Sequence, residues 1–308
     1  MPTVSVNIPC HDSASHLKET IVSVLGQTLK DLEVIVIDDG STDDTGKIVA
    51  SFKDDRIKYY YQENKGLPNA RNKAMEMSRG EYIAFLDHDD LWLPTKLEKQ
   101  VDLLNSHSDI ALVYSNYFCF FPNGKKKLVL KGRQPQDDAF EGFLCNYPVG
   151  ILTAMVRKKV IDRLGLFFDE NVTLCEDYDF FIRLAYQAKA AYITEPLALY
   201  RIHSNMQSIK FGDRYSHEIT YIVDKLKKMY PDLQNKYADA MSRVDSMRDL
   251  MRAKMALVGG EALKAREILK SSRWTGHSFF VLYCATYVPR KILRLIADFN
   301  ARYIDKVR

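Results

Sequence analysis

The sequence predicts an α/β fold with a mainly parallel sheet, and three features support this class. Val4, Val6 and Ile8 alternate with small polar residues, which is the two-residue period of a strand. The run 32–37 is apolar throughout, as expected for a parallel strand buried on both faces. Strand-like and helix-like segments then alternate as far as about residue 110, which favours parallel strands joined by helices.

Each element of this first part follows from its own pattern. The helix after the first strand carries apolar residues at helical spacing, and Ser13 or Ser15 is its expected N-cap. Strands are predicted at 56–62 and 81–86, separated by a helix at 68–78 that Gly80 ends. Pro94 lies near the first turn of the next helix. Because ligands of such sheets bind beyond the carboxyl ends of the strands, we expect a site there.

The pattern changes after about residue 110. An aromatic strand at 110–121, a mixed segment and a helix at about 176–188 follow, and the chain is almost wholly helical from about residue 215. We therefore predict an α/β domain at 1–211, in which the regular strand-helix alternation covers 1–110 and the looser pattern covers 111–211. Residues 212–308 form a predicted helical extension.

Composition restricts the partners. The net charge of +4 is small for a protein of 308 residues, and it lacks the clustered cationic excess of nucleic-acid-binding proteins, so no nucleic acid is expected. The five cysteines are scattered and odd in number, which favours free thiols in a reducing compartment. No signal peptide and no segment of about 18 to 20 apolar residues is present, so we expect a cytoplasmic protein.

The segment 290–308 places apolar residues opposite lysines and arginines, as in a basic amphipathic helix. Such a helix can lie in a membrane interface, which would place the protein on the inner face of the cytoplasmic membrane. The same pattern fits a helix that packs on the catalytic domain or on a second subunit. The sequence leaves both interpretations open.

The acidic cluster 87–90 follows a predicted buried strand. Asp87 and Asp89 are two residues apart, so in an extended chain they project to one side and can share a cation. Mg²⁺ in nucleotide sites is held by one or two carboxylates together with phosphate oxygens. The alternative is a turn that caps the next helix, but three aspartates in four residues exceed what one cap needs.

Two further acidic pairs fit roles in binding or catalysis. Asp38 and Asp39 end the second strand and offer acceptors for a ribose hydroxyl or a base N–H. The alternative is an ordinary strand-turn-helix with Ser41 or Thr42 as the helix cap, which would explain the same residues. Glu176 and Asp177 begin a helix. Thr173 and Glu176 have capping-box spacing, which leaves Asp177 as the candidate general base for an acceptor hydroxyl.

His203 and Arg71 are candidate ligand-binding residues, but neither is specific without the neighbouring motifs. His203 suits a metal ligand, although a lone histidine is more often structural. Arg71 suits a phosphate or a base, although a surface arginine in a salt bridge is commoner.

Taken together, these motifs resemble the family 2 inverting glycosyltransferases over about residues 1–208. The matching segments are Ile8-Pro9-Cys10-His11-Asp12, 35–43, Asn64-Lys65-Gly66, Ala70-Arg71-Asn72, 80–90 and Glu176-Asp177-Tyr178-Asp179. The resemblance implies the GT-A fold, with a catalytic domain at 1–211 in which a nucleotide-sugar-binding half at 1–110 is joined to an acceptor-binding half at 111–211. It also implies a UDP-sugar donor and inversion of the anomeric centre in one displacement.

The resemblance also implies a role for each matching residue. Asp177 would be the catalytic base, and Asp87 and Asp89, with His203 nearby, would hold Mn²⁺ or Mg²⁺ on the donor diphosphate. The residues expected to bind the donor are Pro9, His11, Asp38, Asp39, Arg71, Asp87 and His88, and Glu176 and Arg201 are further candidates. The chain departs from the family at Cys10-His11-Asp12, where a Thr-Tyr-Asn-like triplet is commoner, so stacking of His11 on the base is in doubt.

The function expected is transfer of one sugar to a hydroxyl of a saccharide acceptor, carried on a polyprenyl lipid, in capsule, O-antigen or similar polysaccharide synthesis. The Gln-x-x-Arg-Trp signature and spanning helices of processive polymerases are absent from the sequence. The alternative is a nucleotide-sugar-binding sensor or scaffold without turnover. Nucleotidyl transfer ranks last, because the expected glycine-rich, arginine-lysine loop is missing.

Overall fold

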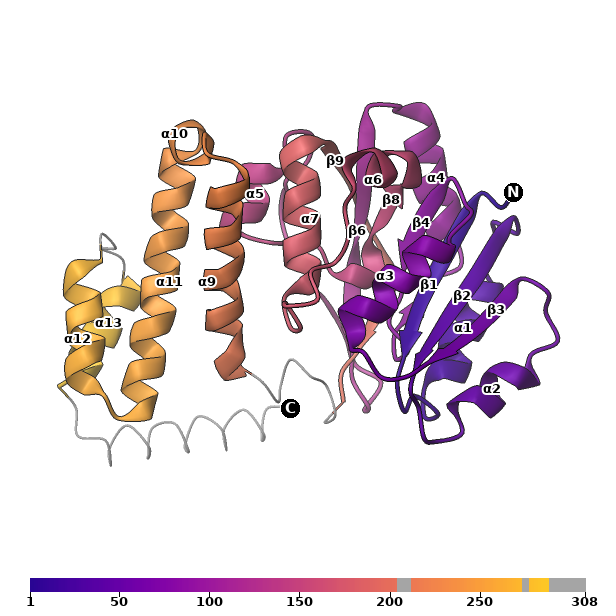
Figure 1. Ribbon diagram of the computed structural model, residues 1–308, viewed down its shortest axis with the longest axis horizontal. Helices are drawn as coiled ribbons and strands as arrows, with labels where there is room; N and C mark the ends of the chain where they lie inside the picture. The colour runs from indigo at the N-terminus through magenta and orange to yellow at the C-terminus, as the bar shows by residue number, and fades with distance from the viewer. Residues whose placement is uncertain (204–211, 273–276, 288–308) are drawn as a thin grey trace. The chain divides into compact units, whose positions relative to one another are not determined.

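The computed structural model describes residues 1–203, 212–272 and 277–287. The chain divides into two compact units, Met1–Phe211 and Gly212–Arg308. The first is a mixed α/β unit and the second is helical in its described part (Figure 1). The α/β class expected from the sequence is confirmed, whereas the division of the first unit into donor and acceptor halves stays a prediction.

Nine strands form one sheet in the order β3-β2-β1-β4-β8-β6-β9-β5, with β7 beside β6. The strands are β1 Val4–Cys10, β2 Leu32–Asp39, β3 Ile57–Gln62, β4 Tyr82–Phe85, β5 Leu91–Trp92, β6 Ile110–Phe120, β7 Lys126–Leu128, β8 Met155–Arg157 and β9 Lys189–Arg201. β1 to β4 are mutually parallel, as are β6 and β9. β8 is antiparallel to both β4 and β6, so it joins the two parallel groups.

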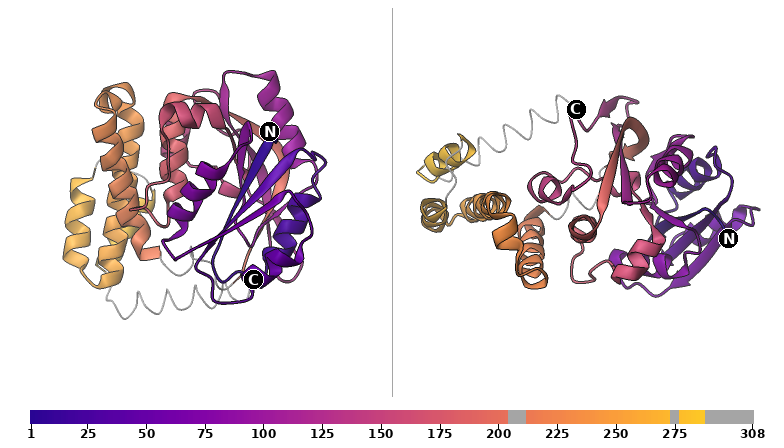
Figure 2. Two further views of the ribbon diagram at one scale, coloured as in Figure 1. Left: turned by 45° about the vertical axis from the view of Figure 1, so that its right-hand side comes forward. Right: turned by 90° about the horizontal axis from the view of Figure 1, so that it is seen from above.

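The helices of the first unit cover both faces of this sheet. They are α1 Leu17–Leu25, α2 Thr45–Ser51, α3 Leu67–Met77, α4 Lys96–Ser106, α5 Phe140–Cys145, α6 Lys158–Leu164 and α7 Glu176–Gln187, with a 3₁₀ turn, η1, at Ile151–Thr153. Figure 2 shows helices on both faces of the sheet. On β2, Val34 and Val36 pack in the core cluster of α1 and α4, whereas Ile35 and Ile37 pack on α3. The continuous apolar run of β2 therefore reflects burial on two faces.

The parallel register brings the carboxyl ends of β1, β2 and β3 to one edge. Cys10 pairs with Asp38, and Asp39 pairs with Gln62. Pro9 lies near the end of β1, opposite Ile37, and is buried. Pairing with β4 ends at Asn7, so the missing N–H of Pro9 costs no ladder bond on that side.

The helix starts differ from the sequence-based expectations. Neither Ser13 nor Ser15 is the N-cap of α1, which begins at Leu17 after His16. The Ser13 hydroxyl instead accepts the backbone N–H of His11 at 3.0 Å. The capping box predicted from Thr173 is also wrong, because Cys175 is the N-cap of α7. The Glu176 side chain is engaged by an arginine, as described below, so it is not a cap.

The second unit consists of α9 Gly212–Met229, α10 Leu233–Lys236, α11 Ala238–Gly259, α12 Ala262–Ser271 and α13 His277–Ala285. α11 packs against both α9 and α12. Gly260 has φ of +91°, ends α11 and turns the chain into α12. No described helix is long and apolar enough to cross a membrane. The predicted basic helix at 290–308 lies outside the described residues.

Candidate active site

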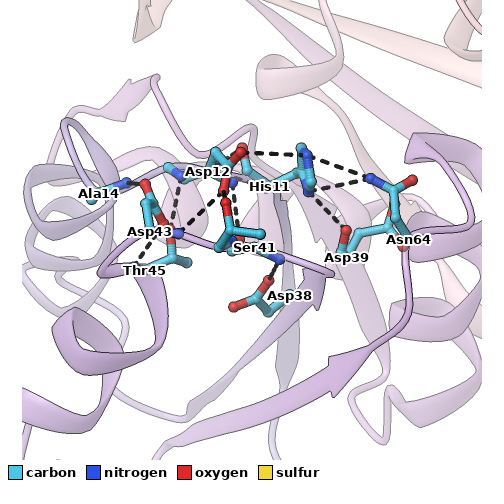
Figure 3. A network of polar contacts seen from close by, with 11 residues as sticks. His11, Asp12, Ala14, Asp38, Asp39, Ser41, Asp43, Thr45 and Asn64 are labelled. Carbon is cyan, nitrogen blue, oxygen red and sulfur yellow. Dashed lines mark hydrogen bonds and ion pairs between the residues drawn. The ribbon is translucent and has the colours of Figure 1, made fainter.

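Two loops at the ends of β1 and β2 are joined by backbone-to-side-chain hydrogen bonds (Figure 3). Asp12 accepts the N–H of Thr42 at 2.8 Å, and its own N–H donates to Ser41 Oγ at 2.9 Å. Asp43 accepts the N–H of Ala14 at 2.9 Å. Asp12 has φ of +46°, a conformation that aspartate tolerates better than most residues. These contacts fix the loop that carries His11.

His11 lies at the rim of this edge with about half of its side chain exposed. Its Nδ1 is 2.8 Å from the backbone oxygen of Asp39, and because a carbonyl only accepts, Nδ1 must carry the proton. The amide of Asn64 lies 3.3 Å from the same ring (Figure 3). The ring is therefore held in place yet accessible, as a nucleoside contact requires.

The two carboxylates at the end of β2 are both engaged within the protein. Asp39 accepts Gln62 Nε2 and the backbone N–H groups of Lys65 and Gly66 at 2.8 to 2.9 Å. Asp38 is buried and accepts the N–H of Ser41 at 2.8 Å and the Tyr59 hydroxyl at 2.6 Å. Both aspartates hold the surrounding loops in this structure, and their contact with a donor stays a prediction.

The acidic loop 87–90 is held from two sides. Thr20 of α1 donates its hydroxyl to the carbonyl oxygens of His88 and Asp90 at 2.8 and 2.9 Å. Arg201, at the end of β9, donates Nε to the carbonyl of Asp89 and its backbone N–H to the Asp90 carboxylate. Burial, then the charges of Asp89 and Asp87, raises the pKa of Asp90 well above its ordinary value. Arg201 thus contacts the loop backbone, and Asp90 is an internal carboxyl.

Asp89 faces His203 across the end of β9. Their Oδ2 and Nε2 atoms are 2.9 Å apart, and both side chains are about one-fifth exposed. Burial raises the pKa of Asp89, but the charge of His88 and the hydrogen bond with His203 outweigh it, so the pKa is lowered. Asp89 is therefore ionised, as a cation ligand must be.

Asp87 forms an ion pair with a buried arginine. Arg71 of α3 is 2% exposed, and its Nη2 lies 2.7 Å from Asp87 Oδ1. Its Nη1 forms a second ion pair with Glu176, at the start of α7. The guanidinium also lies 5.6 Å from the ring centre of Phe168. Arg71 therefore joins the acidic loop to the helix that carries the predicted base.

Two carboxyl groups begin α7, and both have raised pKa values. Burial raises the pKa of Glu176 to about 7, with the Arg71 charge opposing it. Burial likewise raises the pKa of Asp177 to about 6, opposed by Arg71 and by the backbone N–H of Tyr178. Asp177 is partly exposed, whereas Glu176 is buried. A base in contact with solvent and with a pKa near neutrality can take a proton from an acceptor hydroxyl.

Hydrogen bonds, ion pairs and charge interactions connect the predicted site residues in three groups. The groups are His11 with Asp39; Asp89 with His203, His88, Asp90 and Arg201; and Arg71 with Asp87, Glu176 and Asp177. In the described part of the chain, no three His, Cys, Asp or Glu side chains form one metal-holding group. Asp87 therefore does not join Asp89 and His203 as one three-ligand set here.

Sequence reasoning missed two residues that shape this site. Thr20 lies on an ordinary amphipathic helix, and its partners are carbonyl oxygens 68 and 70 residues away, which no local pattern reveals. Phe168 lies in a mixed segment and stacks on Phe180, with ring centres 4.4 Å apart, beneath Arg71. The adjacent pair Phe167-Phe168 was the only local signal for it.

Residues 5–165 match glycosyl transferase family 2, just over half of the chain. With the α/β fold and this acidic site, the match defines the class: the chain belongs to glycosyl transferase family 2. It spans 64% and 65% of the length of two of the curated relatives that it matches.

Three known proteins illustrate the likeness. The chain is 33% identical over 210 residues to TuaG of Bacillus subtilis, a putative teichuronic acid biosynthesis glycosyltransferase, covering 66% of this chain and 81% of TuaG. It is 34% identical over 176 residues to WfgD of Escherichia coli, a UDP-Glc:α-D-GlcNAc-diphosphoundecaprenol β-1,3-glucosyltransferase, covering 57% and 66%. S. aureus TarS 1–349, crystallised with UDP-GlcNAc, superposes with a TM-score of 0.66 at 18% identity, covering 88% and 82%. The last comparison shows the GT-A fold.

Proposed function

We propose that this glycosyltransferase moves a single sugar from a UDP-sugar to a hydroxyl of a saccharide acceptor, with inversion. The observation that supports this most directly is the double ion pair of Arg71. It brings the start of α7, where Asp177 lies, next to Asp87 of the acidic loop. A base beside a diphosphate-binding loop is the arrangement that a single displacement needs.

The donor would bind at the edge formed by the ends of β1, β2 and β4. His11 offers an accessible ring for the nucleoside, and Asp87 with Asp89 faces the position of the diphosphate. Pro9, Asp38, Asp39 and Arg71 contribute by shaping and holding this edge. The name of WfgD gives UDP-Glc as its donor, and TarS was crystallised in complex with UDP-GlcNAc, which supports UDP as the nucleotide here.

The proposed cofactor is Mn²⁺ or Mg²⁺. Asp87 and Asp89 are partly exposed, and each has one oxygen engaged by a neighbouring cation or histidine. Two carboxylates fit such an ion in a nucleotide site, where phosphate oxygens supply further ligands. When bound, the ion would neutralise charge on the departing diphosphate as a Lewis acid. His203 would either keep its hydrogen bond to Asp89 or become a further ligand of the ion.

In the proposed reaction, the acceptor hydroxyl oxygen attacks the anomeric carbon while Asp177 takes its proton. The bond between that carbon and the diphosphate oxygen breaks, and its electron pair leaves with UDP. An α-linked donor therefore gives a β-linked product. The start of α7 aids the ionised form of Asp177, because a helix N-terminus favours negative charge.

The decisive experiment measures release of UDP from a panel of UDP-sugars, with and without Mn²⁺ and with saccharide acceptors. Wild type is compared with Asp89→Ala and Asp177→Asn, and Asp44→Asn, at an exposed aspartate paired only with Lys47, is the control. We expect metal-dependent release from one donor, lost in both site variants and kept in the control. Asp177→Asn should still bind donor, because its role is confined to the acceptor. Transfer at the wild-type rate by Asp177→Asn would remove it from this role, and donor binding without turnover would favour a sensor.

We further propose a lipid-linked acceptor at the inner face of the cytoplasmic membrane, in synthesis of a cell-envelope polysaccharide. Support comes from the names of WfgD, which includes an undecaprenol carrier, and of TuaG, together with the basic pattern of residues 290–308. Flotation with anionic vesicles tests the membrane contact. Full-length folded protein that stays with the soluble fraction would refute it.

A further inference from the structure

Tyr147 lies between α5 and η1, outside every motif that the sequence singled out. Its ring is partly exposed, yet its hydroxyl oxygen is buried and has no hydrogen-bond partner in the structure. A buried hydroxyl without a partner loses its bonds to water and gains none in return, so such groups are uncommon in native proteins. The position of this hydroxyl therefore needs an explanation.

The ring of Tyr147 is fixed by two aromatic neighbours. Its centre lies 5.1 Å from that of Tyr178 and 6.0 Å from that of Phe143, both in edge-on contacts. Tyr178 directly follows Asp177 on α7, and its backbone N–H already donates to Asp177 Oδ1 at 2.7 Å. The packing thus sets the Tyr147 ring beside the first turn of α7, next to the proposed base.

The charged group that acts most strongly on this hydroxyl is the Asp177 carboxylate. Burial, followed by the charge of Asp177, raises the pKa of Tyr147 well above its ordinary value. The hydroxyl therefore keeps its proton at every working pH and can only donate to a neighbouring anion. In return, the neighbouring Tyr147 hydroxyl lowers the pKa of Asp177.

We propose that Tyr147 is a positioning residue of the transfer reaction: with a small turn of its ring, its hydroxyl donates a hydrogen bond to Asp177, with or without a bound acceptor, and orients the carboxylate that accepts the proton. The inference rests on the proposed role of Asp177 as base. A carboxylate oxygen accepts more than one hydrogen bond, so Asp177 can keep the Tyr178 N–H and still bind Tyr147. A fixed donor on one side directs the remaining acceptor position toward the incoming hydroxyl.

Other groups also act on Asp177 and must be held constant in a test. They are Arg71 on α3, Asp87 after β4, Glu176 on α7 itself and Tyr117 on β6. Replacing Tyr147 by phenylalanine leaves all four in place and keeps the ring that packs on Tyr178 and Phe143. The variant Tyr147→Phe therefore isolates the hydroxyl.

The matched control is Tyr114→Phe. Tyr114 is fully buried and, like Tyr147, packs edge-on against Phe143, at 5.7 Å, but its hydroxyl donates to the backbone oxygen of Pro135. Loss of that hydroxyl removes a buried hydrogen bond without touching Asp177. An effect shared by both variants would come from the loss of a buried hydroxyl in general. An effect confined to Tyr147→Phe would come from the lost interaction with Asp177.

The first readout is the dependence of kcat/KM on pH. Without the Tyr147 hydroxyl, the charged form of Asp177 loses a donor, so the acidic limb should move to higher pH by about 0.5 to 1 unit. We expect a roughly three- to tenfold loss of kcat/KM on that limb, with the KM for the donor unchanged. Tyr114→Phe should leave the limb in place. An unmoved limb in Tyr147→Phe, with the wild-type kcat, would overturn the proposal.

The second readout does not need activity. Selective ¹³C labelling of aspartate carboxyl groups, with the Asp177 resonance assigned from Asp177→Asn, follows the titration of Asp177 by NMR. We expect a higher midpoint in Tyr147→Phe than in wild type. Equal midpoints would refute the hydrogen bond. A shifted midpoint in an enzyme for which Asp177→Asn transfers sugar normally would refute the role of Asp177 instead.

Discussion

The buried guanidinium of Arg71 forms an ion pair with Glu176, although 105 residues separate the two in the chain. The same guanidinium contacts Asp87, so one cation neutralises two carboxylates from different parts of the fold. This contact sets the distance between the acidic loop and the start of α7. Arg71 therefore affects both the stability of the first unit and the geometry of the candidate site.

Replacement of Arg71 by methionine should destabilise the first unit strongly. The change leaves Glu176 buried beside Asp87 without a counter-charge, and breaking a buried ion pair in this way typically costs about 3 to 5 kcal/mol. Urea denaturation followed by circular dichroism measures the free energy of unfolding. Lys47→Ala is the control, because the Lys47–Asp44 pair is exposed and should contribute little. A stability within about 1 kcal/mol of wild type for Arg71→Met would contradict the importance of the pair.

Replacement of Lys96 by methionine should stabilise the protein at neutral pH. Lys96 is fully buried, its Nζ donates to Gln100 and lies 4.0 Å from the Trp92 ring centre, and burial lowers its pKa well below the ordinary value. Between its lowered folded-state pKa and the unfolded pKa of 10.5, the unfolded chain therefore binds more protons than the folded one, and stability rises with pH over that range.

Because Lys96→Met removes this proton linkage, its gain in unfolding free energy should be largest near neutral pH and should shrink as the pH approaches 10.5. Thermal and urea denaturation at several pH values measure the difference. Lys99→Met, at a partly exposed lysine paired with Glu195, should show no such trend. A difference independent of pH would mean that Lys96 is charged in the fold.

The activity should decline in acid with the ionisation of the pair at the start of α7. The pKa values of Asp177 and Glu176 are raised to about 6 and about 7, and a base acts only when deprotonated. We therefore expect kcat/KM to fall as the pH drops through this range, with apparent values that belong to both groups together. Steady-state kinetics across the range measures it. A profile that stays flat well below about pH 6 would argue against a base at this position.

Replacement of Gly40 by alanine should impair both stability and donor binding. Gly40 has φ of +81°, and a Cβ there would lie 2.8 Å from the backbone nitrogen of Asn64, beside His11. Gly124 is a matched control, because it has φ of +80° but open space around a Cβ. Both alanine variants should lose roughly 1 kcal/mol or more through backbone strain.

Only Gly40→Ala should also weaken the binding of UDP, because only there must the loop at Asn64 move. Isothermal titration of both variants with UDP in the presence of Mn²⁺ compares them directly. Equal affinities for UDP would show that the Asn64 loop lies outside the nucleotide site.

Much of the fold could be predicted because the signals were local. The apolar run of β2 predicted burial on two faces, and packing of Val36 and Ile37 on opposite faces confirms it. The antiparallel β8, with only three residues, was missed because so short a strand shows no period. Pairing with β4 and β6 decides its conformation.

The sequence by itself determined the family, the alternation of strands and helices, and the acidic ends of the strands, because these depend on residue order and spacing. The tertiary structure alone decided the partners. Asp39 accepts hydrogen bonds from the backbone N–H groups of Lys65 and Gly66, and Asp87 forms an ion pair with Arg71. Tyr147 lies beside the first turn of α7. The pKa of each carboxyl also depends on burial and on charges from distant segments, and those distances exist only once the chain has folded.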